Sequence, residues 1–193
     1  MTEIILASSS PRRINMMKKH GFTPKIMPAD IDETIPQNSG AQDAVMFLAL
    51  KKALHTEQEL LQHSPQYAGS LIIAADTVVH ADKILGKPAG RKEAREMLLS
   101  LRGRSHYVST GVAIIKAGMP VREVFCDTTK VFCKEFSLSE LEEYLDTDEP
   151  YDKAGAYAIQ GVFSKHIDHI EGSFDTVVGF PIDIIKEKIS QYL

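Results

Sequence analysis

The chain has 193 residues, of which 44% are hydrophobic and 25% charged, a composition typical of soluble globular proteins that excludes disorder over the whole chain. Its net charge is -4, so the chain lacks the excess of basic residues that is typical of a general nucleic-acid binder. No apolar run reaches the roughly 18 residues of a membrane span, and the first residues do not form a signal peptide, so we expect a cytoplasmic protein without a membrane partner. The length favours a single domain, residues 1–193, built as two lobes around a cleft.

The first predicted elements are a strand, a tight turn and a helix. Residues 4–7 form a short apolar run that leads directly into a serine-rich turn. Ser10 can serve as the N-cap and Pro11 fits the first helical position, so we expect a helix that begins here and is closed by Gly21.

The rest of the chain contains further predicted strands and helices, without internal repeats and without a linker that divides it. In chain order they are a short strand and a long loop (22–40), a helix (41–57), a buried strand (71–79), a turn (86–88), a helix (91–101), a pair of long strands (105–117 and 121–136), a capped helix (137–146), a Gly/Ala/Tyr-rich stretch (149–161), a further strand pair, and a terminal helix from Ile182.

The two cysteines, Cys126 and Cys133, lie seven residues apart in the second of the long strands. Because side chains alternate between the faces of a strand, this odd spacing places the two thiols on opposite faces. A disulfide between them is not expected, and two cysteines do not make a zinc site.

The serine-rich turn at the start of the first predicted helix is a candidate anion site. A helix N-terminus offers unpaired N–H groups and a partial positive charge, and this turn adds the side chains of Ser8, Ser10, Arg12 and Arg13. Because the helix dipole disfavours cations at this end, the two arginines indicate a compensating anion, for which phosphate is the natural candidate. The alternative is a capped helix with two solvated arginines. The turn lacks the glycines of a Walker A loop or a dinucleotide fingerprint.

Asp76 interrupts an otherwise apolar predicted strand. A carboxylate there is costly to desolvate unless a metal, a cation or hydrogen-bond donors offset the cost, so the position favours a functional role. The alternative is an aspartate at a strand end that bonds backbone amides. Glu33 lies in an acidic loop and is the candidate for a second carboxylate, although such loops are usually solvated.

Lys52 and Lys87 are the candidate cations. Helical spacing places Lys52 on or beside the inward face of its helix, and Lys87 lies in a turn roughly ten residues after Asp76. The alternative for Lys52 is a helix lysine that extends its ammonium to solvent, and the alternative for Lys87 is an ordinary turn lysine. Phosphoryl chemistry needs cations for the non-bridging oxygens and carboxylates for a hard divalent metal, and this chain supplies both sets.

Taken together, these segments resemble the Maf family of nucleotide pyrophosphatases, within the inosine-triphosphatase-like superfamily, over nearly the full length of the chain. No single motif is decisive, but their order and spacing are highly specific. The matching segments are residues 7–13, 48–49 with 52–53, 75–79, 86–88, 105–108 with 110–112, and 149–161.

The resemblance implies an α/β fold with a mixed twisted sheet and flanking helices, in two lobes around a cleft. It also implies hydrolysis of a nucleoside triphosphate to the monophosphate and pyrophosphate with a divalent cation, Mg²⁺ or Mn²⁺. Asp76 matches the residue assigned in that family as proton acceptor for the attacking water. Arg12, Thr77 and Gln160 match residues associated with the choice of substrate. The sequence of residues 154–161 is similar to the subfamily that prefers dTTP and UTP, and a homodimer would be in keeping with the family.

A physical reading agrees with this assignment, because a glutamine amide offers both a donor and an acceptor to the N3–H and O4 edge of uracil or thymine. We expect the turn at residues 8–13, Lys52 and Lys87 to hold phosphate oxygens. Glu33 and Asp76, with phosphate oxygens and waters, are expected to hold the Mg²⁺ or Mn²⁺. Either Asp76 or the metal then activates the water that attacks the α-phosphate.

Two alternatives to hydrolysis of dTTP and UTP for house-cleaning of the nucleotide pool stay open. A non-catalytic nucleotide-binding regulator of cell division, acting in septum formation, could use the same pocket, although a pure binding module gains nothing from Asp76 beside phosphates. The same hydrolysis could also be directed at modified pyrimidine nucleotides.

Overall fold

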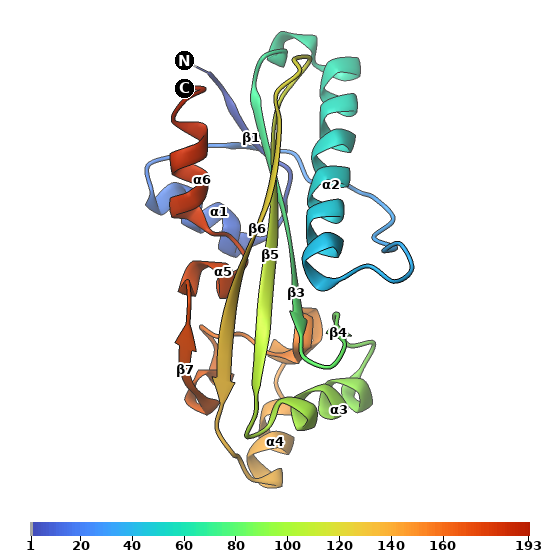
Figure 1. Cartoon of the computed structure of the whole chain (residues 1–193), viewed down its shortest axis with the longest axis vertical. Helices are drawn as coiled ribbons and strands as arrows, with labels where there is room; N and C mark the ends of the chain where they lie inside the picture. Colours follow the sequence, from blue (N-terminus) through green and yellow to red (C-terminus); the bar gives the residue numbers. More distant parts are fainter. Residues whose placement is uncertain (1) are drawn as a thin grey trace. The chain divides into compact units, whose positions relative to one another are not determined.

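A computed structural model of the chain describes residues 2–193 (Figure 1). Within this range there are seven strands, six α-helices and four short 3-10 helices. In chain order these are β1 (Ile4–Leu6), α1 (Pro11–Lys19), β2 (Lys25–Ile26), α2 (Ala41–His63), η1 (Pro65–Tyr67), β3 (Leu71–His80), β4 (Ile84–Leu85), α3 (Arg91–Leu101), β5 (Ser105–Lys116), β6 (Arg122–Cys133), α4 (Leu138–Leu145), η2 (Glu149–Asp152), η3 (Ala154–Ala156), η4 (Val162–His166), β7 (Ile167–Glu171), α5 (Phe174–Val178) and α6 (Ile182–Ile189).

The strands form one mixed sheet. Their order is β2-β1-β3-β5-β6-β7, and β4 pairs with β3 outside this path. Strand β1 is parallel to both of its neighbours, with Ile5 opposite Lys25 of β2 and Ile72 of β3. The pairs β3–β4 and β6–β7 are antiparallel. This mixed sheet with its flanking helices confirms the α/β class expected from the sequence.

The chain folds as two compact units. The first comprises the residues up to 76 together with 110–127 and 179–193, and the second comprises 77–109 and 128–178. The long strands β3, β5 and β6 each contribute residues to both units. The two units accord with the expected two lobes, whereas the assignment of residues 1–193 to a single domain stays a prediction.

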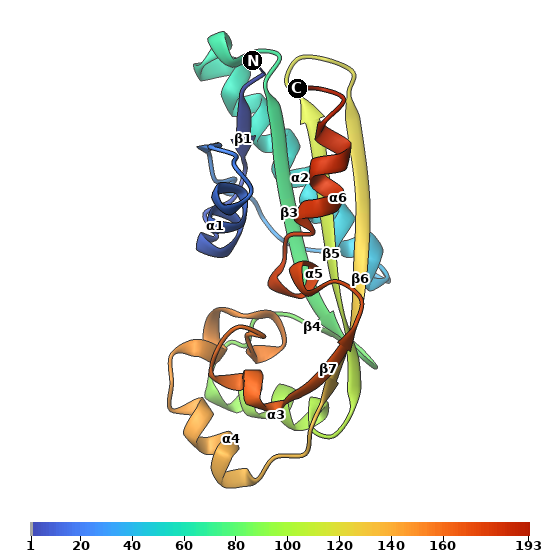
Figure 2. The same ribbon diagram turned by 90° about the vertical axis from the view of Figure 1, so that its left-hand side faces the viewer.

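In the first unit, the alternation of side chains along the strands gives the sheet two buried faces. On one face Leu6 belongs to a cluster with Met17 of α1 and Ile185 of α6. On the other face Ile5 belongs to a cluster with Ala53 of α2. Figures 1 and 2 show the corresponding layers, with α2 on one side of the strands and α1 and α6 on the other. Burial on both faces explains why these strands read as continuous apolar runs.

Helix α2 extends beyond the predicted helix and ends at His63. Its buried positions Ala49, Ala53, Thr56 and Leu60 continue the helical spacing past residue 57, so the inward face requires the longer helix. Neither α2 nor any other helix within residues 2–193 is long and apolar enough to cross a membrane.

Gly111 of β5 allows the strand to lie very close to α2. A Cβ atom at this position would be 2.4 Å from the carbonyl carbon and the carbonyl oxygen of Val45. Because both atoms belong to the backbone of a helix, they cannot rotate away from a new methyl group.

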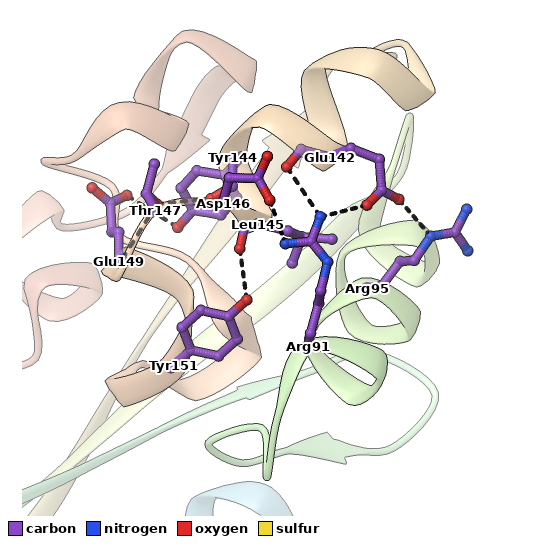
Figure 3. Close-up of polar contacts among 9 residues, drawn as sticks. All are labelled: Arg91, Arg95, Glu142, Tyr144, Leu145, Asp146, Thr147, Glu149 and Tyr151. Atoms are coloured by element: carbon purple, nitrogen blue, oxygen red, sulfur yellow. Dashed lines mark hydrogen bonds and ion pairs between the residues drawn. The ribbon is translucent and has the colours of Figure 1, made fainter.

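A single apolar cluster forms the core of the second unit, and α3 and α4 both contribute to it. On the surface, ion pairs join the two helices: Arg91 donates to Glu142 at 2.7 Å and to Asp146 at 2.6 Å, and Arg95 donates to Glu142 at 2.8 Å (Figure 3). Because such exposed pairs contribute little each, the buried cluster provides most of the stability.

The prediction of a strand pair after residue 161 is wrong. The described segment instead forms η4, the strand β7 and the short helix α5. Phe163 and His166 are both buried, and their three-residue spacing matches the turn of a 3-10 helix. Strand β7 pairs with β6, so a second new strand is not needed to satisfy its backbone.

His106 is fully buried in the second unit, and its Nε2 lies 2.7 Å from the hydroxyl of Tyr157. Burial and, to a smaller extent, the charge of His80 together lower the pKa of His106 to about 4. The Nδ1 atom lies 4.0 Å from Sγ of Cys133, whose pKa burial raises to about 12. Cys133 and Cys126 are both free thiols on β6, as expected.

The burial of His106 predicts a loss of stability in mild acid. The unfolded chain binds the proton with a pKa of 6.5 and the folded chain with a pKa of about 4, so the contribution of His106 is complete above pH 6.5 and is lost as the pH falls toward 4. Between pH 7 and pH 4.5 the lost free energy of unfolding should be about 2.5 kcal/mol. Urea denaturation at pH 7 and pH 4.5 measures it. His106→Gln should have a flatter pH dependence, and a parallel loss in both proteins would rule out His106 as its source.

Candidate active site

Strand β1 leads into the serine-rich turn and α1 as expected. Ser10 occupies the N-cap and Pro11 begins α1, but the Ser10 hydroxyl makes no capping hydrogen bond. Instead, the backbone N–H of Ser10 donates to Oγ of the buried Ser8 at 3.2 Å. Ser8 therefore holds the turn in place at the N-terminus of α1, where the first N–H groups of the helix lack helical partners. Arg12 lies half-buried in this first helical turn.

Arg13 joins three segments of the first unit. Its Nη1 donates to the carbonyl oxygen of Ala75 at 2.7 Å and to Oγ of Ser8 at 3.3 Å. Its Nε donates to the carbonyl oxygen of Gly179 at 2.9 Å. Burial lowers the pKa of Arg13, and the nearby carboxylate of Asp76 opposes that effect. The guanidinium therefore fixes the backbone next to Asp76, a structural role that the sequence did not reveal.

Lys52 bridges the two carboxylates that the sequence singled out. Its Nζ lies 2.6 Å from Oδ1 of Asp76 and 2.7 Å from Oε1 of Glu33. The side chains of Lys52 and Asp76 are only 12% and 14% exposed, whereas that of Glu33 is 55% exposed. A lysine on the inner side of α2 is explained by this position, because its ammonium offsets the cost of desolvating Asp76.

The loop that carries Glu33 is held by a turn around this residue and by one hydrogen bond from α2. Oδ1 of Asp32 accepts hydrogen bonds from the backbone N–H of Thr34 at 3.0 Å and from its hydroxyl at 2.6 Å. These bonds lower the pKa of Asp32. Nζ of Lys51 donates to the carbonyl oxygen of Asp32 at 2.5 Å. Sequence reasoning missed this bond from Lys51. It could have found the turn, because an Asp two residues before a Thr is a recognisable Asx-turn signal.

The candidate oxygen ligands for a metal beside Lys52 are two carboxylates, those of Glu33 and Asp76. Within residues 2–193 no group of three or more His, Cys, Asp or Glu side chains is arranged to hold a metal ion. Glu33 and Asp76 nevertheless meet at one cation, Nζ of Lys52. Because Mg²⁺ keeps several waters and binds through one or two carboxylates plus substrate phosphates, a carboxylate pair fits such an ion.

The other predicted substrate residues belong to the second unit. Thr77 is half-buried on β3, and Lys87 is exposed in the turn between β4 and α3. This turn is tied to η3, because the N–H of Gly155 donates to the carbonyl oxygen of Gly86 at 3.0 Å. Gln160 is exposed in the stretch before η4. Ser8, Arg13, Glu33, Lys52 and Asp76 thus belong to the first unit, and Thr77, Lys87 and Gln160 belong to the second.

Comparison with known proteins shows the family to which this chain belongs. Residues 3–192 match the family described as Maf-like protein, and the chain belongs to this family. It is 41% identical over 188 residues to a protein of Desulfitobacterium hafniense, covering 97% of this chain and 84% of the relative. A relative from Caldicellulosiruptor bescii is 43% identical over 183 residues, covering 94% and 90%. A third, from Desulforamulus reducens, is 41% identical over 193 residues, covering 100% and 97%. All three relatives carry the name dTTP/UTP pyrophosphatase.

A search of solved structures gives a weaker likeness. A protein from Vibrio cholerae is 11% identical, with coverage of 77% of this chain and 72% of that one, at a TM-score of 0.32.

Proposed function

We propose that this protein is a nucleoside triphosphate pyrophosphatase that hydrolyses dTTP and UTP to the monophosphate and pyrophosphate. The observation that carries the proposal is the bridge from Lys52 to Asp76 and Glu33, in a chain whose relatives are named dTTP/UTP pyrophosphatase. Such a nucleoside triphosphate diphosphatase can clean the nucleotide pool of the cytoplasm, where we place the protein. A homodimer is part of the same proposal, and light scattering of the purified protein tests it.

The cationic and N–H groups bind the triphosphate in this proposal. The N-terminus of α1, with Ser8 and Ser10, binds phosphate oxygens through N–H and hydroxyl donors. Arg12, Arg13, Lys52 and Lys87 offset the negative charge of the substrate and of the departing pyrophosphate.

Asp76 activates the attacking water in the proposed mechanism. Its carboxylate is positioned by Nζ of Lys52 at 2.6 Å and by the backbone that Arg13 holds at Ala75. A carboxylate in this position can accept the proton of a water molecule as it attacks the α-phosphate. Glu33 and Asp76 would hold Mg²⁺ or Mn²⁺, which would add charge neutralisation at the phosphate oxygens.

Release of pyrophosphate, measured separately from orthophosphate, tests the proposed function. The panel contains dTTP, UTP, modified pyrimidine triphosphates and purine triphosphates, each with Mg²⁺, with Mn²⁺ and with a chelator. We expect pyrophosphate from dTTP and UTP and loss of turnover in the chelator. Nucleotide binding without any turnover would support a non-catalytic regulator instead, and preferential turnover of a modified pyrimidine would redirect the substrate assignment.

Gln160→Glu is expected to reverse the preference for pyrimidines. The amide offers a donor and an acceptor to uracil or thymine, whereas a carboxylate only accepts and would repel O4. We expect the ratio of kcat/KM for UTP to that for ATP to fall about 10²-fold. Gln62→Glu, at an exposed position of α2, is the matched control. An unchanged ratio in Gln160→Glu would remove this residue from base recognition.

A further inference from the structure

The carboxylate of Glu149 holds the segment that follows Gln160. Its Oε2 accepts a hydrogen bond from the backbone N–H of Val162 at 2.8 Å, and its Oε1 accepts one from Phe163 at 3.4 Å. Val162 and Phe163 are the first residues of η4, and these N–H groups have no partners within that helix. Glu149 thus connects η2 to the residues directly after Gln160.

Tyr144 supports the same carboxylate from the opposite direction. Its hydroxyl donates to Oε1 of Glu149 at 3.0 Å and lies 3.3 Å from the carbonyl oxygen of Ala156. Tyr144 is buried, and burial raises the pKa of its hydroxyl, an effect that the charge of Glu149 increases. The hydroxyl therefore remains protonated and remains a donor. Three donors in all converge on the carboxylate of Glu149.

The backbone on either side of Glu149 is also fastened (Figure 3). Oγ1 of Thr147 accepts from the N–H of Glu149 at 3.3 Å and donates to the carbonyl oxygen of Tyr144 at 2.7 Å. The hydroxyl of Tyr151 donates to the carbonyl oxygen of Leu145 at 2.6 Å. Since Leu145 ends α4, Glu149 is connected through these bonds to the rigid helices of the second unit.

Gly161 leaves the space that Glu149 occupies. A Cβ atom on Gly161 would lie 2.0 Å from Oε2 of Glu149. The N–H of Gly161 donates to the carbonyl oxygen of Ala158 at 3.2 Å, which closes the turn that carries Gln160. The exposed side-chain amide of Gln160 is therefore one residue away from Gly161. Gly161 packs against the carboxylate of Glu149, which accepts three hydrogen bonds.

We propose that Glu149 is a positioning residue for Gln160, which presents the glutamine amide in one orientation to the pyrimidine base. This inference rests on the proposed function, in which Gln160 reads the base. Without the carboxylate, the two N–H groups of η4 lose their partner, the turn at residues 158–161 loses its anchor, and the amide no longer meets N3–H and O4 together.

Glu149→Gln tests the proposal with almost no change of volume. The amide keeps one acceptor oxygen and replaces the other with an NH2 group, which cannot accept a hydrogen bond from a backbone N–H. We expect the Kd and KM for UTP to rise about tenfold, the values for ATP to change less than twofold, and kcat for UTP to stay within about twofold of wild type. The matched control is Glu143→Gln, an exposed glutamate on α4.

Gly161→Ala provides an independent variant that acts on the same contact. In the wild-type background its new methyl group displaces the carboxylate, so we expect the same loss of pyrimidine preference. In a Glu149→Ala background the space is vacant, and Gly161→Ala should add no further loss. Additive losses in the double variant would contradict the proposal.

Equilibrium binding of UTP and ATP to the Glu149→Gln and wild-type proteins decides between the outcomes without requiring turnover. A lower melting temperature with an unchanged ratio of the two Kd values would make Glu149 a merely structural residue and overturn the proposal. If wild-type protein binds UTP but releases no pyrophosphate, the proposed function fails, while the ratio of Kd values still decides the role of Glu149. A wild-type protein that binds no nucleotide overturns both.

Discussion

Asp76→Asn should lower kcat for pyrophosphate release from UTP by about 10³-fold. Asparagine has nearly the same shape, but its amide cannot accept a proton from the attacking water at neutral pH. It also removes one of the two carboxylates that meet at Nζ of Lys52. The measurement is steady-state pyrophosphate release, with the binding of UTP and thermal unfolding determined on the same preparation.

Asp82→Asn is the matched control for this experiment. Asp82 is exposed in the turn after β3 and pairs with Arg104 at 3.1 Å on the surface, so its loss should change neither turnover nor stability appreciably. A near wild-type rate for Asp76→Asn would contradict the assignment of Asp76 as the proton acceptor. An unfolded Asp76→Asn protein would show that the carboxylate is needed mainly to pair with Lys52.

Gly111→Ala should destabilise the first unit by about 3 kcal/mol, which corresponds to a melting temperature roughly 6–12 °C lower. The new Cβ would lie 2.4 Å from backbone atoms of Val45, and relief of this overlap requires β5 and α2 to separate. Such a separation loosens the contacts of Ala49 and Ala53 with the sheet. Chemical denaturation measures the free energy of unfolding directly.

Gly86→Ala is the control for the glycine substitution. A Cβ at Gly86 meets nothing within 4 Å, so the stability should change by less than about 1 kcal/mol. Equal stability of the two variants would contradict the close approach of β5 to α2. A Gly111→Ala protein that does not fold at all is the limiting form of the expected result.

The parts of the site that sequence reasoning could predict are those fixed by local rules. Ser10 and Pro11 mark the start of α1 because capping and the fixed φ of proline act within a few residues. The position of Lys52 on the inner side of α2 follows from helical spacing alone. Asp76 stood out because a carboxylate in an apolar strand requires a partner, and the structure supplies Lys52.

The contacts that escaped prediction join residues that are far apart in the chain. No local pattern connects Arg13 to the carbonyl oxygens of Ala75 and Gly179, and no periodicity shows that Gly111 faces the backbone of Val45. The sequence predicts a strand pair after residue 161, because a 3-10 helix buries residues at a three-residue spacing, which is not distinctive over one turn. Tertiary pairing with β6 decides its structure.

The bond from Arg13 to Gly179 spans 166 residues, and it bears on the order in which these contacts form during synthesis. Because translation proceeds from the N-terminus, the arginine leaves the ribosome long before the segment that supplies its carbonyl partner. The parallel pairing of β1 with β3 likewise waits for a chain of more than 70 residues. A nascent chain can therefore carry all of the residues from Ser8 to Asp76 before Gly179 is available to hold the guanidinium of Arg13, which contacts the backbone beside the carboxylate.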